Sequence, residues 1–135
     1  MDTCFSIPLI DKEIKMKKML IVEDDIPSQG VMRRTFKSDF EMDFCESSEE
    51  YYEKYSNTNY DIIIMDISLR GSKNGLEMIK EIKAAPDFNG TPILCLTAHA
   101  QIRMKQTAIE AGSDSFITKP VATKTLKEAV TLLLR

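Results

Sequence analysis

Short, continuously apolar segments constrain the fold of this chain more than any other feature of its sequence. Two of them, residues 62–65 (IIIM) and 93–96 (ILCL), hold four consecutive apolar residues each. Such a run is too short for a buried helix, whereas a half-exposed strand would alternate apolar and polar residues. Continuous apolar runs are typical of central strands in a parallel sheet, because helices cover both faces of such a sheet.

The segments around these two runs add three strands and the helices between them. Further strands are expected at residues 19–22, at 42–44, where apolar and acidic residues alternate, and at 116–118. Pro27 suits the first turn of a helix that should run to about residue 38, since its missing N–H costs nothing there. Ser47 and Glu50 have the spacing of a capping box for a second helix. Three more helices are expected at 76–83 before Pro86, at 102–111 before Gly112, and at 126–133.

Five strand–helix units in a row predict an α/β domain. Right-handed crossovers then give a doubly wound, five-stranded parallel sheet with helices on both faces. The length of 135 residues suits one such domain, at residues 19–135. Residues 1–18 are expected to form an N-terminal extension or a short extra element.

Composition excludes several other classes of protein. The 18 basic and 21 acidic residues give a net charge of −3, which argues against direct nucleic-acid binding. We find neither a signal peptide nor an apolar stretch near the roughly 18–20 residues of a membrane helix. Cys4, Cys45 and Cys95 are far apart and accompany a single histidine, so a zinc site is not expected. Reduced thiols fit a cytoplasmic location, with Cys45 and Cys95 as core residues.

Four of the predicted strands are followed at their carboxyl ends by residues that are mostly polar. In chain order these are Glu23, Asp24 and Asp25, then Asp66, then Thr97 with Ala98, and finally Lys119 with Pro120. The carboxyl ends of parallel strands meet at one edge of the sheet, so these side chains should converge there. Clustered carboxylates repel one another, and a hard cation such as Mg²⁺ relieves that repulsion.

Together, these groups suit phosphoryl transfer. A carboxylate, a metal ion, an ammonium group and a hydroxyl around one point position the phosphoryl group and stabilise its charge. Asp66 ends the most buried strand and is therefore the best candidate nucleophile.

Residues 19–134 resemble a receiver domain of the response regulators in two-component signal transduction. The resemblance rests on residues 20–25 (LIVEDD), 61–66 (DIIIMD), 96–98 (LTA) and 116–120 (FITKP), together with the Ala111–Gly112 pair. It implies a flavodoxin-like (βα)5 fold. It also implies a signalling switch in a phosphorelay, not an enzyme beyond its own phosphorylation and dephosphorylation.

The resemblance implies roles for the acidic residues. Asp66 would be the phosphoacceptor, which takes its phosphoryl group from a histidine kinase or a histidine phosphotransfer protein. Glu23, Asp24 and Asp66 would hold Mg²⁺, with the backbone carbonyl of Ser68 completing the protein ligands. Asp25 is better read as a helix-start residue.

The remaining matches imply the parts of a switch. Thr97 would turn its hydroxyl toward the acyl phosphate, beside Ala98, and Lys119 would bridge to a phosphate oxygen. A cis peptide bond is expected before Pro120. Phe116 would swing between exposed and buried positions, although plain strand packing also explains an aromatic residue there.

The chain departs from the family pattern in the loop after the phosphoacceptor. Leu69 and Arg70 stand where relatives usually have Met-Pro, and Gly75 falls one residue late, so this loop is longer. His99 could border the route of an attacking water, but a solvated loop histidine is the simpler interpretation.

The expected partners are a phosphohistidine donor and a downstream protein, without direct nucleic-acid or membrane contact. The chain would be a monomer or a weak, phosphorylation-linked homodimer. No room for an output domain follows residue 134, so we expect a single-domain regulator or a fragment.

Three alternatives remain. An aspartyl phosphatase or dehalogenase would need a second acid where Ser68 stands, and a flavodoxin-like FMN protein would need a hydroxyl-rich loop where the Glu23 segment lies. A receiver-like module that has lost phosphorylation would not need the complete set of site residues.

Overall fold

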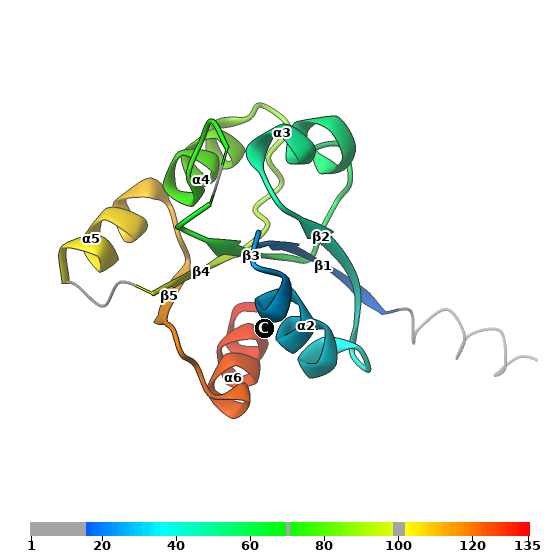
Figure 1. The fold of residues 1–135 in the computed structure, drawn as a ribbon. Helices are drawn as coiled ribbons and strands as arrows, with labels where there is room; N and C mark the ends of the chain where they lie inside the picture. Colours follow the sequence, from blue (N-terminus) through cyan, green and yellow to red (C-terminus); the bar gives the residue numbers. More distant parts are fainter. Residues whose placement is uncertain (1–15, 70, 99–101) are drawn as a thin grey trace, which may run out of the picture.

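The computed structural model describes residues 16–69, 71–98 and 102–135 (Figure 1). Its five strands form one parallel sheet in the order β2-β1-β3-β4-β5. The strands are β1 (Lys17–Val22), β2 (Phe40–Cys45), β3 (Ile62–Asp66), β4 (Ile93–Thr97) and β5 (Ser115–Thr118). The direction of winding reverses between β1 and β3, so the ligand crevice of such a sheet lies at their carboxyl ends.

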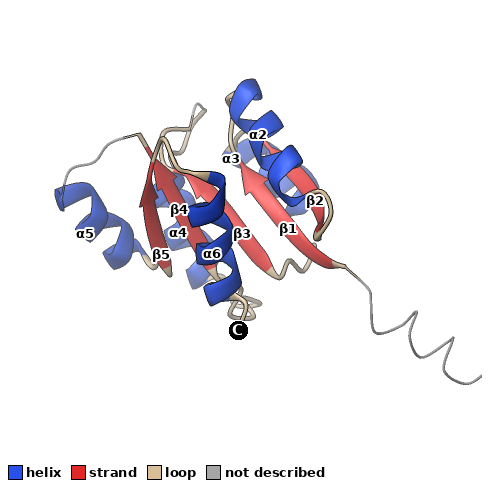
Figure 2. Cartoon of the chain, turned by 90° about the horizontal axis from the view of Figure 1, so that it is seen from below, coloured by secondary structure: helices blue, strands red, loops and turns tan. Residues whose placement is uncertain are grey.

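Helices cover both faces of this sheet, which confirms the predicted fold class (Figures 1 and 2). α2 (Ile26–Phe36) and α6 (Thr123–Leu133) lie on one face. The other face carries α3 (Ser48–Glu50), which continues as the π-helix η1 (Tyr51–Tyr55), together with α4 (Gly75–Ala84) and α5 (Ile102–Ala111).

The sheet separates two apolar cores. Successive side chains of a strand point to opposite faces, and β3 shows this clearly. Ile63 packs in the core beneath α4 and α5, whereas Ile64 packs in the core beneath α2 and α6. All five residues of β3 are buried. The continuous apolar runs in the sequence therefore reflect two covered faces.

Capping differs from the sequence prediction at one helix. Ser47 accepts a hydrogen bond from the backbone N–H of Glu50, as expected of a capping residue. The predicted reciprocal bond is wrong, because the Glu50 carboxylate accepts from the N–H of Glu46 at 2.8 Å instead. A complete capping box occurs at α4, between Asn74 and Glu77.

Other local predictions are confirmed. Asp25 caps α2 by accepting from the N–H of Ser28 at 3.0 Å, and Pro27 lies in the first turn. Gly112 ends α5 with a φ of 111°, a region that favours glycine. Cys45 and Cys95 are buried, and burial raises their pKa values to about 11 and about 12.

Within the described ranges, no helix has both the length and the apolar character needed to cross a membrane.

Candidate functional site

Three carboxylates meet at the carboxyl edge of the sheet. Glu23 and Asp24 directly follow β1, and Asp66 is the last residue of β3. One oxygen from each lies within 4.8 Å of the other two, with Glu23 and Asp66 buried. Closely spaced carboxylate oxygens are the donor set that Mg²⁺ prefers, so this cluster fits that ion.

Lys119 reaches this cluster from the end of β5. Its Nζ lies 2.6 Å from Oε1 of Glu23 and 3.6 Å from Oδ2 of Asp66. Its backbone N–H donates to the carbonyl of Thr97 at 2.7 Å, which ties the segment after β5 to the end of β4. The peptide bond between Lys119 and Pro120 is cis. An ammonium group therefore lies against two of the three carboxylates.

Burial and neighbouring charges set the pKa values of Glu23 and Lys119. Burial raises the pKa of Glu23 to about 7, and nearby Asp66 adds to the rise while Lys119 opposes it. Burial lowers the pKa of Lys119, but the hydrogen bond with Glu23 and the charge of Asp66 outweigh that effect and raise it. Lys119 is therefore a lasting positive charge at neutral pH.

The backbone of Glu23 is held on two sides. Its N–H donates to the carbonyl of Cys45 at 2.8 Å, and its carbonyl accepts from Nε2 of Gln29 at 2.6 Å. Gln29 lies buried in α2 and was not among the residues predicted for the site. The available signal was a polar residue on the inward face of an otherwise amphipathic helix.

The chain after Asp66 is packed closely against the strand end. The N–H of Ser68 donates to Oδ1 of Asp66 at 3.1 Å, which orients the carboxylate. At Gly75, the first residue of α4, a Cβ atom would lie 2.2 Å from the backbone carbonyl oxygen of Asp66. Only a residue without a side chain allows α4 to begin here. Gly75 was noted in the sequence for its spacing alone, and this contact was not predicted.

The lengthened loop before α4 is anchored to α3. Glu49 accepts hydrogen bonds from the N–H of Ser72 at 3.2 Å and from the hydroxyl of Ser48 at 3.1 Å. The side-chain hydroxyl of Ser72 is the main cause that lowers the pKa of Glu49 to about 2, and the backbone N–H groups of Glu49 and Ser72 lower it further. Arg70 of the same loop lies outside the described residues.

The predicted switch residues lie on the neighbouring strands. Thr97 ends β4 and is buried, and Ala98 after it is exposed. Phe116 on β5 is half-buried and packs against the core beneath α4 and α5. This position is compatible with both interpretations of Phe116. His99 lies outside the described residues.

Comparison with protein families and curated proteins gives concordant matches. A family model described as the response regulator receiver domain matches residues 19–131. The regulatory protein VanRB of Enterococcus faecalis is 34% identical over 119 residues, covering 87% of this chain and 52% of VanRB. The chemotaxis protein CheY of Halobacterium salinarum is 30% identical over 119 residues, covering 87% of this chain and 97% of CheY. The chain spans about half the length of VanRB and nearly all of CheY.

Solved structures agree with these matches. A putative response regulator from Chloroflexus aurantiacus superposes with a TM-score of 0.83 at 28% identity, covering 89% of this chain and 98% of that one. The chemotaxis response regulator CheY4 of Vibrio cholerae gives 0.81 at 26% identity, covering 89% and 100%. The receiver domain of the sensor histidine kinase PA1611 of Pseudomonas aeruginosa, which has magnesium in its cleft, shares the fold at 0.79 and 23% identity, covering 89% and 98%.

Proposed function

Because this chain belongs to the response regulator receiver domain family, a family of signalling switches, we propose that Asp66 is its phosphoacceptor. The donor would be the phosphohistidine of a histidine kinase or of a histidine phosphotransfer protein. The observation that carries the proposal is the contact of Lys119 with both Glu23 and Asp66, at 2.6 and 3.6 Å. An ammonium group beside a buried carboxylate nucleophile is what phosphoryl transfer needs.

The transfer forms one bond and breaks another. An oxygen of the Asp66 carboxylate attacks phosphorus, the phosphorus–nitrogen bond of the donor breaks, and the imidazole leaves. The product is an acyl phosphate on Asp66. The Ser68 N–H holds Oδ1, which leaves Oδ2 on the Lys119 side as the attacking atom. Lys119 then neutralises an oxygen of the transferred group.

Mg²⁺ is the cofactor that the acidic cluster fits. Glu23, Asp24 and Asp66 would hold the ion, together with the backbone carbonyl of Ser68. When bound, it supplies positive charge that lowers the repulsion between the carboxylates and an incoming phosphoryl group.

The response to phosphorylation is assigned to the neighbouring strands. Thr97 would bond the new phosphoryl oxygens beside Ala98, and Phe116 would then turn inward. The surface around α5, β5 and α6 changes as a result, because the two states make different contacts. A downstream protein would read that surface. We further propose a cytoplasmic monomer or a weak, phosphorylation-linked homodimer.

Intact mass after treatment with acetyl phosphate tests the phosphoacceptor. With Mg²⁺ the chain should gain the mass of one phosphate, and without Mg²⁺ the gain should be small. The variant Asp66→Asn should gain none, whereas Asp39→Asn, an equal charge change at an exposed turn, should behave as the parent. Phosphate on the Asp66→Asn variant would refute the assignment. Absence of a gain in the parent would identify a receiver-like module without phosphorylation.

A further inference from the structure

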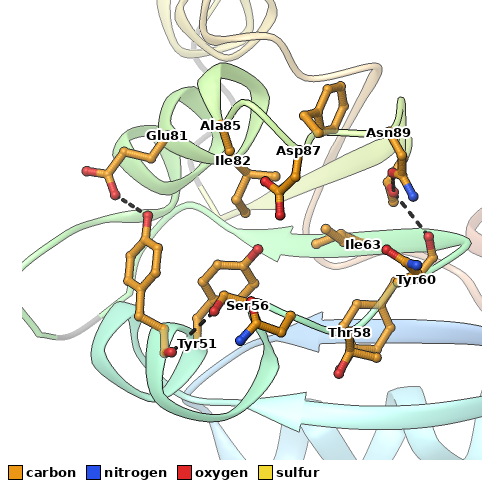
Figure 3. A pocket seen from close by; sticks show the side chains of 15 residues that line it. Tyr51, Ser56, Thr58, Tyr60, Ile63, Glu81, Ile82, Ala85, Asp87 and Asn89 are labelled. Carbon is orange, nitrogen blue, oxygen red and sulfur yellow. Dashed lines mark hydrogen bonds between the residues drawn. The ribbon is translucent and has the colours of Figure 1, made fainter.

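A pocket of about 300 Å³ opens at the amino edge of the sheet, far from the acidic cluster (Figure 3). It lies between η1 with the following residues 56–60 on one side and the end of α4 with residues 85–91 on the other. Ile63, near the start of β3, lines it, whereas Asp66 ends the same strand at the opposite edge. Its volume lies at the lower end of the range for small-molecule sites.

The lining of this pocket is aromatic, amide-rich and acidic. It includes three tyrosines, three asparagines and two carboxylates, Glu81 and Asp87. None of the described lining residues is a lysine, an arginine or a histidine. Glu81 is already paired, since Nζ of Lys73 lies 2.5 Å from its Oε2 atom and the Tyr52 hydroxyl donates to its Oε1 atom. Asp87 is exposed and lines the pocket, and it forms neither a hydrogen bond nor an ion pair with any other described residue.

Tyr51 supplies a second group without a partner. The residue is only 8% exposed, yet no hydrogen bond joins its hydroxyl to another residue of the described ranges. The other two tyrosines of the lining are satisfied, because Tyr52 donates to Glu81 and Tyr60 donates to Asp43 at 2.7 Å. No buried side-chain oxygen or nitrogen of the described residues lacks a partner, so the Tyr51 hydroxyl is accessible to solvent, and Tyr51 lines the pocket.

Tyr51 and Asp87 line the same pocket. Figure 3 shows Tyr51 on the η1 side and Asp87 on the α4 side of the pocket. Both residues line the pocket, and burial, followed by the charge of Asp87, raises the pKa of Tyr51. A ligand between them would meet a carboxylate, a free hydroxyl and the faces of aromatic rings.

We propose that this pocket binds a small organic cation with an ammonium or guanidinium group. Asp87 provides the opposite charge, and the Tyr51 hydroxyl accepts a hydrogen bond from the ligand. The rings of Tyr51 and Tyr60 favour a cation further, because the face of an aromatic ring is electron-rich, whereas the Tyr52 ring already has Nζ of Lys73 5.6 Å from its centroid. An anion would meet the charge of Asp87 and no basic lining residue, so anionic ligands are disfavoured.

Titration of the complete chain with agmatine, followed by backbone amide shifts in NMR spectra, tests this proposal. Saturable shifts are expected, concentrated at residues 56–60 and 85–91. Affinity should fall at least about tenfold in Asp87→Asn, and several-fold in Tyr51→Phe, which loses no hydrogen bond to a described residue. The neutral analogue 1,4-butanediol should give no saturable shift at the same concentrations.

Asp39→Asn is the matched control, because it removes the same charge from an exposed residue that does not line the pocket. It should bind agmatine as the parent does. Absence of saturation, unchanged affinity in Asp87→Asn, or an equal loss in Asp39→Asn would overturn the proposal. The readout involves no phosphorylation, so its result is independent of the function assigned to Asp66.

Discussion

At the scale of single residues, the acidic cluster suits metal binding but lowers the stability of the metal-free protein. Glu23, Asp24 and Asp66 are like charges brought within 4.8 Å, and Lys119 compensates only part of their repulsion. Asp66→Asn should therefore stabilise the metal-free protein by roughly 1 kcal/mol, the value of about one pKa unit of interaction. The asparagine Oδ1 can still accept the bond from the Ser68 N–H. Thermal unfolding in the presence of a chelator measures the difference.

Addition of Mg²⁺ provides the second half of this prediction. The parent should gain more stability from Mg²⁺ than Asp66→Asn does, because only the native protein with all three carboxylates holds the ion well. Equal stabilisation of both proteins, or a lower stability of the variant without metal, would contradict it.

Sequence patterns predicted most residues of the site because each follows an apolar strand directly. Glu23, Asp66 and Lys119 come together because β1, β3 and β5 are parallel and end at the same edge of the sheet, with only β4 between β3 and β5. The role of Gln29 could not be predicted from the sequence, because its hydrogen bond to the Glu23 carbonyl depends on how α2 packs against the sheet. The contact of Lys119 with Glu23 likewise needed three-dimensional distances.

At the scale of elements, replacement by alanine is expected to change stability in opposite directions at two helical glycines. A Cβ at Gly75 would lie 2.2 Å from the backbone oxygen of Asp66, so Gly75→Ala must move α4 away from β3. We expect a loss of roughly 1–3 kcal/mol, despite the better helix propensity of alanine. At Gly30 in α2 the nearest atom is the flexible Nη1 of Arg34 at 3.4 Å, so Gly30→Ala should stabilise by about 0.5–1 kcal/mol. Urea unfolding followed by far-UV circular dichroism measures the free energy of unfolding of both variants. A change of the same sign in both would refute the steric argument.

Strands and helix positions were predictable from apolar patterns, but details of capping and loops were not. At α3 the capping box is incomplete because the N–H of Glu46 competes for the Glu50 carboxylate. The π-helical turn of η1 follows no sequence signal that we recognised. Glu49 anchors a loop 23 residues further along the chain, and a contact of that separation is set by the fold.

At the scale of the whole molecule, the two cores share one sheet. β1, β3 and β4 contribute residues to the core beneath α4 and α5 and to the core beneath α2 and α6. Disruption of one core therefore removes support from the strands of the other. A single domain of this size is expected to unfold in one cooperative step.

The tyrosines offer a direct test of that cooperativity, because the chain has no tryptophan and its four tyrosines all lie within residues 51–60. They report on the face that carries η1 and α4. Leu126 lies on the opposite face, in α6, with 2% of its surface exposed. Leu126→Ala should cost about 2–5 kcal/mol and lower the unfolding midpoint of tyrosine fluorescence as much as that of far-UV circular dichroism.

Leu132→Ala in the same helix is the control, because Leu132 is 61% exposed and its truncation should change stability by less than about 0.5 kcal/mol. If Leu126→Ala shifts the circular dichroism transition but leaves the tyrosine transition of the far face in place, the two cores unfold independently. A common shift of both transitions means that the sheet couples them. A change made at the acidic cluster would then reach both faces through the same strands that position Asp66 and Lys119.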